Sequence, residues 1–235
     1  MIEPELKEIA NMIGDPELRR KVMSIMRGPR VNIQVEEEGL PVATSPAGIT
    51  RHHSYTRGLV DHIVSTARVA LSLCDVIEDV YHGKVNRDYV VAGVLLHDIM
   101  KPLTYREKDE GGYQVTHLGQ RLDHLTLIVA EGYRKRLPLG LLHILTSHHG
   151  EAASPIGPRT LEALVVSLSD LVDSRLVGDI LRAAQFGVRD CIGEEVGQIS
   201  AEEAFSIVYA RQTRGCDGVK AAFDQIKQRR ASNKK

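Results

Sequence analysis

The sequence predicts a single all-α domain, and three observations lead to that prediction. Apolar residues recur at spacings of three and four, which is typical of a long amphipathic helix. They are Leu59, Ile63, Ala67, Ala70, Cys74 and Ile77. Strands and helices do not alternate as they do in a parallel α/β protein, and no segment repeats. A chain of 235 residues suits one generous hydrophobic core.

The N-terminal segment is expected to form two short helices followed by an irregular cover. The first helix spans residues 4–13, and the run Asp15-Pro16-Glu17 starts a second one that continues to about residue 27. Residues 28–50 are interrupted by prolines and glycines and have no helical period, so we expect an extended cover. The alternation at residues 31–35 allows a short strand there.

Helices dominate from residue 54 onward. The long helix ends near residues 81–83, and Asn86 caps the next one, which Pro102 should end after Lys101. Residues 103–117 contain Gly111-Gly112 and are expected to form a loop, with room for a small β-hairpin. Further helices are expected at 119–136, 139–148, 159–185, 200–212 and 217–229. The first of the last two opens with a capping box, Ser200-Ala-Glu-Glu203, and the basic tail 231–235 should be disordered.

The overall composition excludes several classes of protein. A net charge of −1 gives no general attraction to nucleic acid or to anionic membranes. Three widely spaced cysteines predict neither a disulfide framework nor a zinc knuckle, and Cys74 lies on the apolar stripe. No apolar run approaches the length of a membrane span, and the acidic N-terminus does not resemble a signal peptide. We therefore expect a soluble, cytoplasmic protein without a membrane partner.

A His-Asp pair stands at the end of a very apolar run. His97 and Asp98 follow Val-Val-Ala-Gly-Val-Leu-Leu, and burying a carboxylate costs several kcal/mol unless a cation or strong donors receive it. One interpretation is a buried, salt-bridged pair. The other is a divalent cation held between the two side chains.

Further histidines and acids in apolar or helix-end contexts favour the metal. They are His62, His124, His148 and Asp170. Imidazole and carboxylate ligands suit Fe, Mn, Zn, Ni or Co, and none of the candidates is a thiolate. Six protein ligands are too many for one tetrahedral ion and suit two ions, with Asp98 bridging them. The residues leave open whether one or two ions bind.

The order and local sequence of these ligands resemble the HD-domain superfamily of metal-dependent phosphohydrolases. The resemblance covers residues 50–176 and is closest to a branch with the motifs His52-His53-Ser54-Tyr55-Thr56-Arg57-Gly58-Leu59-Val60-Asp61-His62 and Ser147-His148-His149-Gly150. That branch includes the catalytic part of bacterial 3′→5′ exoribonucleases and an archaeal phosphodiesterase acting on dihydroneopterin 2′,3′-cyclic phosphate.

The resemblance implies a single HD-domain helical bundle with a metal centre between its helices. We divide the chain into an N-terminal cover (1–49), the HD core (50–186) and a C-terminal helical extension (187–235). By position in the motifs, one ion would be held by His62, His97, Asp98 and Asp170. The other would be held by Asp98, His124 and His148, with His149 as a further candidate. Two residues depart from the family pattern, namely Met100 in place of Gly and Asp123 before the fourth ligand.

Four further residues are assigned roles around this centre. Lys101 is either a catalytic and substrate-binding group that neutralises a phosphate oxygen or a solvated residue at a helix end. Arg57 either binds the phosphate or is an ordinary surface residue. His53 and His149 are candidates for protonating the leaving group, because imidazole titrates near neutral pH.

These expectations lead to a phosphodiesterase that hydrolyses a small phosphate ester, such as a cyclic phosphate, with water activated by the ions. A 3′→5′ exoribonuclease or a nucleotide phosphohydrolase is the alternative. RNA ranks below a small substrate, because neither an OB-like run of strands nor a basic stripe with aromatic residues is visible. A third hypothesis is a non-catalytic metal- or nucleotide-binding module. The terminal helices leave room for a homo-oligomer.

Overall fold

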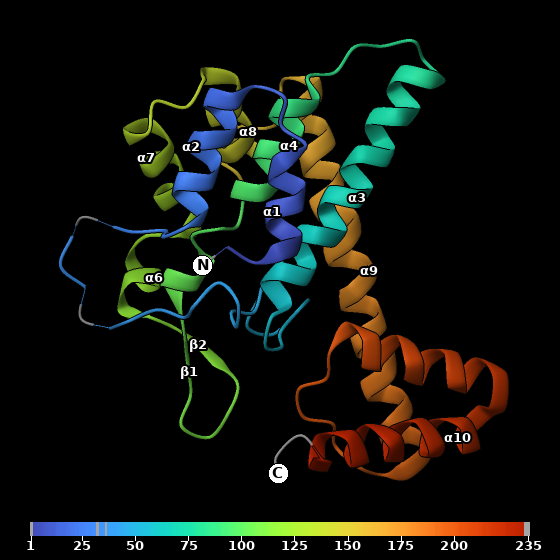
Figure 1. Cartoon of the computed structure of the whole chain (residues 1–235). Coiled ribbons are helices and arrows are strands. Elements are labelled where there is room, and N and C mark those ends of the chain that lie inside the picture. Colours follow the sequence, from blue (N-terminus) through green and yellow to red (C-terminus); the bar gives the residue numbers. More distant parts are fainter. Residues whose placement is uncertain (1, 32, 36, 233–235) are drawn as a thin grey trace.

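Two long helices that pack side by side carry the fold. In the computed structural model, which describes residues 2–31, 33–35 and 37–232, α3 (Gly58–Asp79) lies against α9 (Leu161–Ile192) (Figure 1). The apolar stripe expected at 59–77 is on the buried face of α3, and Thr160 caps α9 by accepting a hydrogen bond from the Ala163 amide. Among the described residues, the secondary structure is helical apart from one short hairpin, so the all-α prediction is confirmed.

The most apolar helix lies at the centre of the bundle. α4 (Arg87–Leu96) is capped by Asn86, and every residue from Val90 to Leu96 is buried. It packs against α3, α9 and α8 (Leu139–Ser147), and the N-terminal helices α1 (Pro4–Asn11) and α2 (Pro16–Met26) cover it from outside. The main core is therefore built around the helix that leads directly to His97.

α4 ends earlier than expected. His97 is its C-cap, residues 97–100 form a turn, and α5 (Lys101–Thr104) begins where the helix should have ended. The prediction that Pro102 terminates the helix is wrong. Pro102 stands in the first turn of α5, where a missing N–H removes no helical hydrogen bond. The turn separates His97 and Asp98 from the regular helix.

The expected hairpin follows α5 and is confirmed. Strands β1 (Tyr105–Glu107) and β2 (Tyr113–Val115) are antiparallel, with Arg106 opposite Gln114. The single helix expected at 119–136 is instead two, α6 (His117–Arg121) and α7 (His124–Arg134). Asp123 caps α7 by accepting a hydrogen bond from the Thr126 amide, so His124 is the first residue of a helix rather than a residue in its middle.

The N-terminal cover agrees with expectation except for one element. Asp15 caps α2 as predicted, accepting from the amides of Glu17 and Leu18. The strand considered at 31–35 is not formed by the residues of that stretch that are described, which are 31 and 33–35. Residues 32 and 36 lie outside the described part of the chain.

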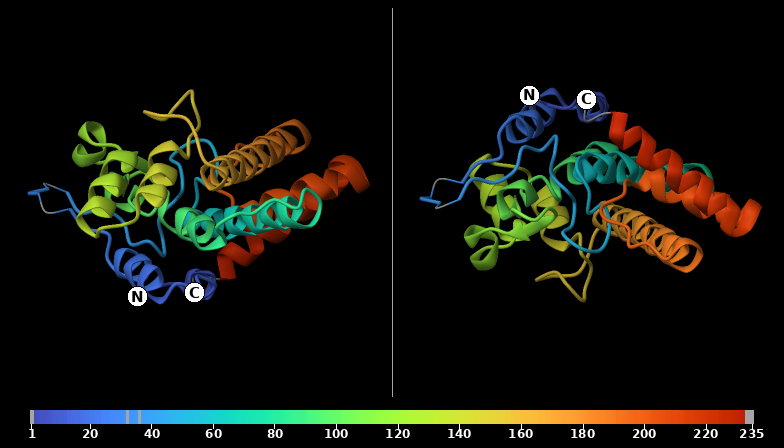
Figure 2. Two further views of the ribbon diagram at one scale, coloured as in Figure 1. Left: turned by 90° about the horizontal axis from the view of Figure 1, so that it is seen from above. Right: turned by 90° about the horizontal axis from the view of Figure 1, so that it is seen from below.

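The C-terminal residues fold into a second apolar cluster with the far half of α9. α10 (Ala201–Ser232) is interrupted at Gly215, whose φ of 59° turns the chain back on itself. The capping box is confirmed by reciprocal bonds between Ser200 and Glu203. Views from above and below show this part extending away from α7 and α8 (Figure 2). Ala231 and Ser232 belong to α10, contrary to the expected disordered tail, and residues 233–235 lie outside the described part.

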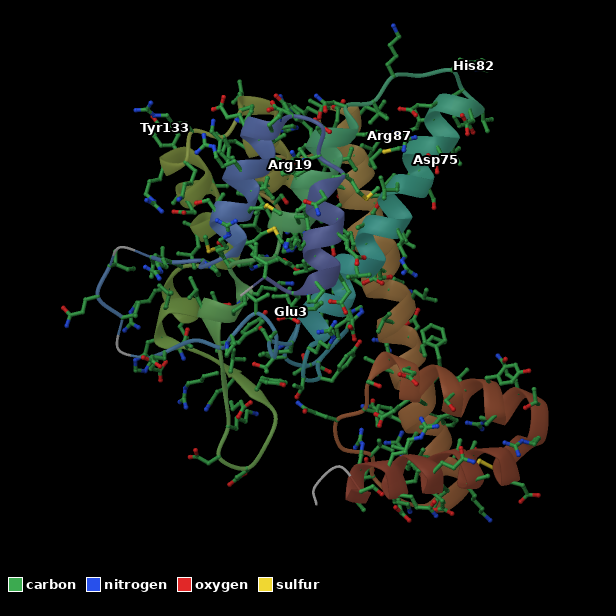
Figure 3. All side chains as sticks on the ribbon, in the orientation of Figure 1. Glu3, Arg19, Asp75, His82, Arg87 and Tyr133 are labelled. Atoms are coloured by element: carbon green, nitrogen blue, oxygen red, sulfur yellow. A yellow bond between two sulfur atoms is a disulfide. The ribbon has the colours of Figure 1, made fainter. Side chains whose placement is uncertain are left out.

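A disulfide between Cys191 and Cys216 joins the end of α9 to α10, as the bond between two sulfur atoms in Figure 3 shows. The sequence did not suggest any disulfide, so this is a correction. Cys74 is free and buried, as expected. None of the helices formed by described residues is both long enough and apolar enough to span a membrane.

Candidate metal centre

Six predicted ligands converge from five parts of the chain. His62 comes from α3, His97 and Asp98 from the turn after α4, and the other three begin α7, cap α8 and lie in α9. These three are His124, His148 and Asp170. All but His124 are buried, and its side chain is 14 % exposed. The site lies where the two apolar clusters of α9 meet, between Val166 and Val177.

Asp98 lies at the middle of the centre, and its two oxygens face different partners. Oδ2 lies 3.3 Å from Nε2 of His62 and 3.5 Å from Nε2 of His97. Asp170 Oδ1 is 3.2 Å from the same nitrogen of His62. The two histidine Nε2 atoms are themselves 3.0 Å apart. The Nε2 atoms of His62 and His97 and Oδ2 of Asp98 thus form a group that could hold an ion, and Asp170 Oδ1 lies beside it next to His62.

The other oxygen of Asp98 faces a second group of imidazoles. Oδ1 lies 3.2 Å from His124 Nε2 and 3.8 Å from His148 Nε2. All three atoms are buried, and none has a hydrogen-bond partner among the described residues. A nitrogen of His149 lies within 4.8 Å of these atoms. Buried polar atoms are normally satisfied, so three of them that point together fit a divalent cation.

The ligand rings are held with the correct nitrogen facing inward. His97 Nδ1 donates to the Val94 carbonyl at 2.7 Å, and His148 Nδ1 donates to the Leu145 carbonyl at 2.9 Å. Because a carbonyl only accepts, the proton must be on Nδ1, which leaves the Nε2 lone pair for a cation. His62 Nδ1 lies 2.6 Å from Asp173 Oδ2, a partner that the sequence did not assign. Ser174 donates to Asp170 Oδ1 and orients that carboxylate.

The charges at the centre match those of a ligand set. Burial lowers the pKa of His97 and of His148, so both rings are neutral at neutral pH. Burial alone would raise the pKa of Asp98, but the neighbouring Lys101 ammonium is the largest effect that opposes it, and the pKa lies well below its usual value. Burial also opposes charge on His62, yet the carboxylates of Asp170, Asp173 and Asp98 raise its pKa well above the ordinary value. A proton on His62 thus meets the same need for positive charge that a divalent cation would meet.

Lys101 belongs to the interior of the site. Its residue is 6 % exposed, and Nζ donates to Asp98 Oδ2. Burial opposes the charge, but the Asp98 carboxylate raises the pKa of Lys101 above its usual value, so the ammonium is retained. The alternative of a solvated lysine at a helix end is excluded.

The two histidines considered as acids occupy different positions. His149 lines the cavity above the metal centre, whereas His53 is buried behind it, with Nε2 3.6 Å from Asp173 Oδ2. Burial lowers the pKa of His149 to about 4 and that of His53 to about 3. Both rings are therefore neutral near pH 7, and protonation of a leaving group by either requires the bound substrate to raise its pKa.

Arg57 is not brought to the cavity. Its guanidinium pairs with Glu3 at 3.2 Å and with Glu5 at 2.5 Å. Glu3 lies at the start of α1 and is labelled in Figure 3. It also lies 3.6 Å from Asp61, one turn further along α3. In this arrangement Arg57 ties the N-terminal helix to α3, and its predicted role in binding the phosphate would require these pairs to open.

The cavity beside the metal centre has arginines that sequence reasoning missed. Its volume is about 560 Å³, and Lys101, His148, His149 and Asp170 line it together with Arg51, Arg175 and Arg182. Arg175 and Arg182 are seven residues apart and share one face of a helix, but Asp170 does not lie on that face, so their spacing did not connect them with the site. Arg51, in the irregular stretch before α3, gave no comparable signal.

The two departures from the expected motif support the scaffold. Met100 is fully buried within the main core and does not line the cavity. Asp123 is engaged as the cap of α7. Neither residue replaces or blocks a ligand.

The fold and the site define a helical protein with a buried histidine–aspartate centre that can hold divalent cations. Comparison with known proteins agrees. Residues 59–175 match the family model described as the HD domain. The chain is 41 % identical, over 186 residues, to the dihydroneopterin 2′,3′-cyclic phosphate phosphodiesterase of Methanocaldococcus jannaschii, which covers 79 % of this chain and 74 % of that protein.

Bacterial relatives are more distant. The 3′-5′ exoribonuclease YhaM of Listeria monocytogenes is 33 % identical over 141 residues, covering 56 % of this chain and 43 % of the exoribonuclease. The chain thus spans less than half the length of that relative. No solved structure matches it significantly. The chain belongs to the HD-domain family, and the predicted class, an HD-domain phosphohydrolase, is confirmed.

Proposed function

We propose that this phosphohydrolase is a phosphodiesterase that acts on a small cyclic phosphate or nucleotide-like ester, such as dihydroneopterin 2′,3′-cyclic phosphate. The observation that carries the proposal is the position of Asp98, whose two oxygens face two separate groups of ligand atoms. Two ions that shared this carboxylate would suit hydrolysis at a phosphoryl centre. The archaeal relative supports the substrate class, because its name specifies a cyclic phosphate.

The residues divide into two groups of ligands. His62, His97, Asp98 and Asp170 would hold one ion, and Asp98, His124 and His148 the other, with His149 as an additional donor. Iron and manganese suit this mixture of imidazole and carboxylate. When bound, such ions supply a Lewis acid for the phosphate and lower the pKa of a coordinated water.

The remaining groups position the substrate. Lys101 is charged and held against Asp98, so its ammonium can donate to a non-bridging phosphate oxygen at the cavity floor. His149 lines the same cavity and can donate a proton to the departing alkoxide once the anionic substrate has raised its pKa. His53 contributes indirectly, because it contacts the Asp173 carboxylate that holds His62.

The volume of the cavity and the net charge of the protein favour a small substrate over RNA. The cavity of about 560 Å³ lies within the range of small-ligand sites. The net charge of −1 provides no general attraction for a polyanion. Because of the exoribonuclease relatives, 3′→5′ RNA hydrolysis is the alternative function, but this chain matches less than half of the Listeria protein.

We also propose a cytoplasmic location and a homo-oligomer for this protein.

The test combines metal analysis with a substrate panel. Protein purified without chelator should contain up to two ions of iron or manganese per chain. It should hydrolyse dihydroneopterin and nucleoside 2′,3′-cyclic phosphates faster than short RNA oligomers. Asp98→Asn should remove both the ions and the activity, because it weakens both groups of ligands. Asp217→Asn, on the surface of α10, is the matched control and should change neither. Faster hydrolysis of RNA, or an active Asp98→Asn protein, would contradict the proposal.

A further inference from the structure

The cavity beside the metal centre is lined by several positively charged side chains. They are Arg51, Lys101, Arg175 and Arg182, and Asp170 is the one carboxylate among the described residues that line the cavity. Lys101 and the metal ligands form the floor. The three arginines come from the loop before α3 and from the stretch of α9 that follows Asp170.

The level at which Arg51 and Arg182 meet can be given along the axis of α9. A Cβ atom added to Gly178 would lie 3.7 Å from the Arg51 carbonyl oxygen and 3.8 Å from Arg182 Nη1. The Arg182 side chain and the loop thus meet at the level of Gly178. This glycine is eight residues beyond Asp170, which corresponds to about 12 Å along the helix axis. The Arg51 backbone and the Arg182 side chain therefore lie further along α9 than the Asp170 carboxylate, although all three residues line the same cavity.

Arg175 and Arg182 each donate a hydrogen bond to Asp179 and have further N–H donors. Asp179 accepts a hydrogen bond from Arg175 Nε at 3.1 Å and another from Arg182 Nη2. Each guanidinium has five N–H donors, so most of them remain available. Arg51 has no ion pair or side-chain hydrogen bond with any residue in the described part of the chain. One carboxylate therefore pairs with two arginines of the cavity, and Arg51 has no ion pair in the described part of the chain.

We propose that Arg51 and Arg182, assisted by Arg175, form a specificity subsite for the non-reacting half of the substrate. The inference rests on the proposed phosphodiesterase function and deepens it. The subsite would bind hydrogen-bond acceptors further along α9 than Asp170, on the same molecule as the scissile phosphate. Two kinds of group supply such acceptors at the far end of a small cyclic phosphate, namely a second phosphate and the carbonyl and ring nitrogens of a heteroaromatic base. Guanidinium forks suit both.

The experiment compares substrates that share one reacting ring. Propane-1,2-diol cyclic phosphate carries nothing beyond that ring. Dihydroneopterin 2′,3′-cyclic phosphate and guanosine 2′,3′-cyclic phosphate add a heteroaromatic base, and the 5′-phosphorylated guanosine compound adds a second phosphate. kcat and KM are measured for the metal-loaded wild type, Arg51→Ala, Arg182→Ala and the double variant. Arg189→Ala is the control, because this exposed arginine lies further along α9 and does not line the cavity.

In the double variant, kcat/KM should fall by about 10- to 100-fold for the substrates with a remote group, mainly through KM. It should stay within about twofold for propane-1,2-diol cyclic phosphate, as it should for every substrate with Arg189→Ala. A loss confined to the 5′-phosphorylated compound would identify a phosphate subsite, and a loss shared by all compounds with a base would identify a base subsite. Calorimetric binding of the product guanosine monophosphates should weaken in parallel.

Two results would overturn the inference. An equal loss on all substrates, including propane-1,2-diol cyclic phosphate, would place the arginines on the scissile phosphate. No loss on any substrate would leave them without a role in recognition. If the metal-loaded wild type hydrolysed none of the compounds, the proposed function would fail instead, which is a distinct outcome.

A pair of glycine variants tests the same space without removing charge. Gly178→Ala should be tolerated, since its Cβ would meet its neighbours at ordinary van der Waals distances. Gly178→Leu should fill the region between Arg51 and Arg182. It should therefore raise KM for the larger substrates but not for propane-1,2-diol cyclic phosphate. An unchanged KM in Gly178→Leu would also count against the subsite.

Discussion

Asp173 offers a direct test of how the metal centre is supported. Its Oδ2 lies 2.6 Å from His62 Nδ1, and the side chains of both residues are fully buried. Asp173→Asn keeps the volume of the side chain and an oxygen that can accept from Nδ1–H. The substitution removes the negative charge, which makes His62 a weaker electron donor at Nε2. The substitution therefore alters a residue that orients His62 and leaves every proposed ligand in place.

The expected magnitude follows from the position of this carboxylate. Groups that orient a metal ligand typically contribute 10- to 100-fold in metal affinity or activity, which is about 1.4 to 2.7 kcal/mol. We expect the upper part of that range. The hydrogen bond is short and charge-assisted, and no solvent reaches either partner. In the proposed arrangement the affected ion would be the one beside His62, His97 and Asp170, so an ion beside His124 and His148 should bind almost as before.

The assay is a titration of metal-free protein with divalent ion in competition with a coloured chelator, which resolves two classes of site. Asp173→Asn should weaken one class, leave the stoichiometry unchanged at high ion concentration and preserve the helical circular dichroism. Asp190→Asn is the control, because that residue lies on the same helix in an exposed ion pair with Arg211. Wild-type affinity in Asp173→Asn would refute the reasoning, as would an equal loss in both variants or a loss of helix content.

Three other perturbations have defined outcomes. Removing the ions with a chelator should lower Tm by about 8–16 °C, since an ion at 1,000 times its Kd stabilises the folded protein by about 4 kcal/mol. Tm is measured by differential scanning fluorimetry, and an unchanged value would show that the ions do not support the fold. Gly93→Ala should destabilise by about 1–3 kcal/mol in urea, because its Cβ would lie 2.6 Å from Ile144 Cγ2, whereas Gly197→Ala, with no neighbour within 4 Å, should not. Reducing the Cys191–Cys216 disulfide should lower the free energy of unfolding by about 3.5 kcal/mol, as expected for a separation of 25 residues. The metal content should not change. Loss of metal on reduction would argue that the two apolar clusters are coupled.

Much of the bundle could be predicted because its signals are local. The apolar stripe of α3, the cap Asn86 and the capping box at Ser200 depend on residues within one or two turns of each other. The candidate ligands stood out for a related reason, since Asp98 and Asp170 each interrupt an apolar stretch of the sequence. A buried acid is costly enough to stand out even when its partner is distant in sequence.

The features that could not be predicted depend on tertiary contacts. α4 stops at Leu96 although the apolar pattern continues, and the His97 ring takes up the Val94 carbonyl near that helix end. The Cys191–Cys216 bond depends on α10 turning back at Gly215, which the spacing of cysteines does not reveal. The arginine wall depends on the loop at Arg51 lying against Gly178, a contact between residues far apart in the sequence.

The position of the metal centre on α9 connects its chemistry to the stability of the fold. Asp170 and Asp173 lie between the apolar cluster that ends at Val166 and the one that begins at Val177. Three buried carboxylates, those two and Asp98, meet one protonated histidine and one lysine in the metal-free protein. That arrangement leaves buried atoms unsatisfied and one negative charge in excess, whereas one divalent cation in place of the His62 proton would balance the charges of these groups. Binding of ions should therefore hold α9 as one continuous helix across the junction, and hydrogen exchange at 167–176 should slow more on metal addition than exchange in α10.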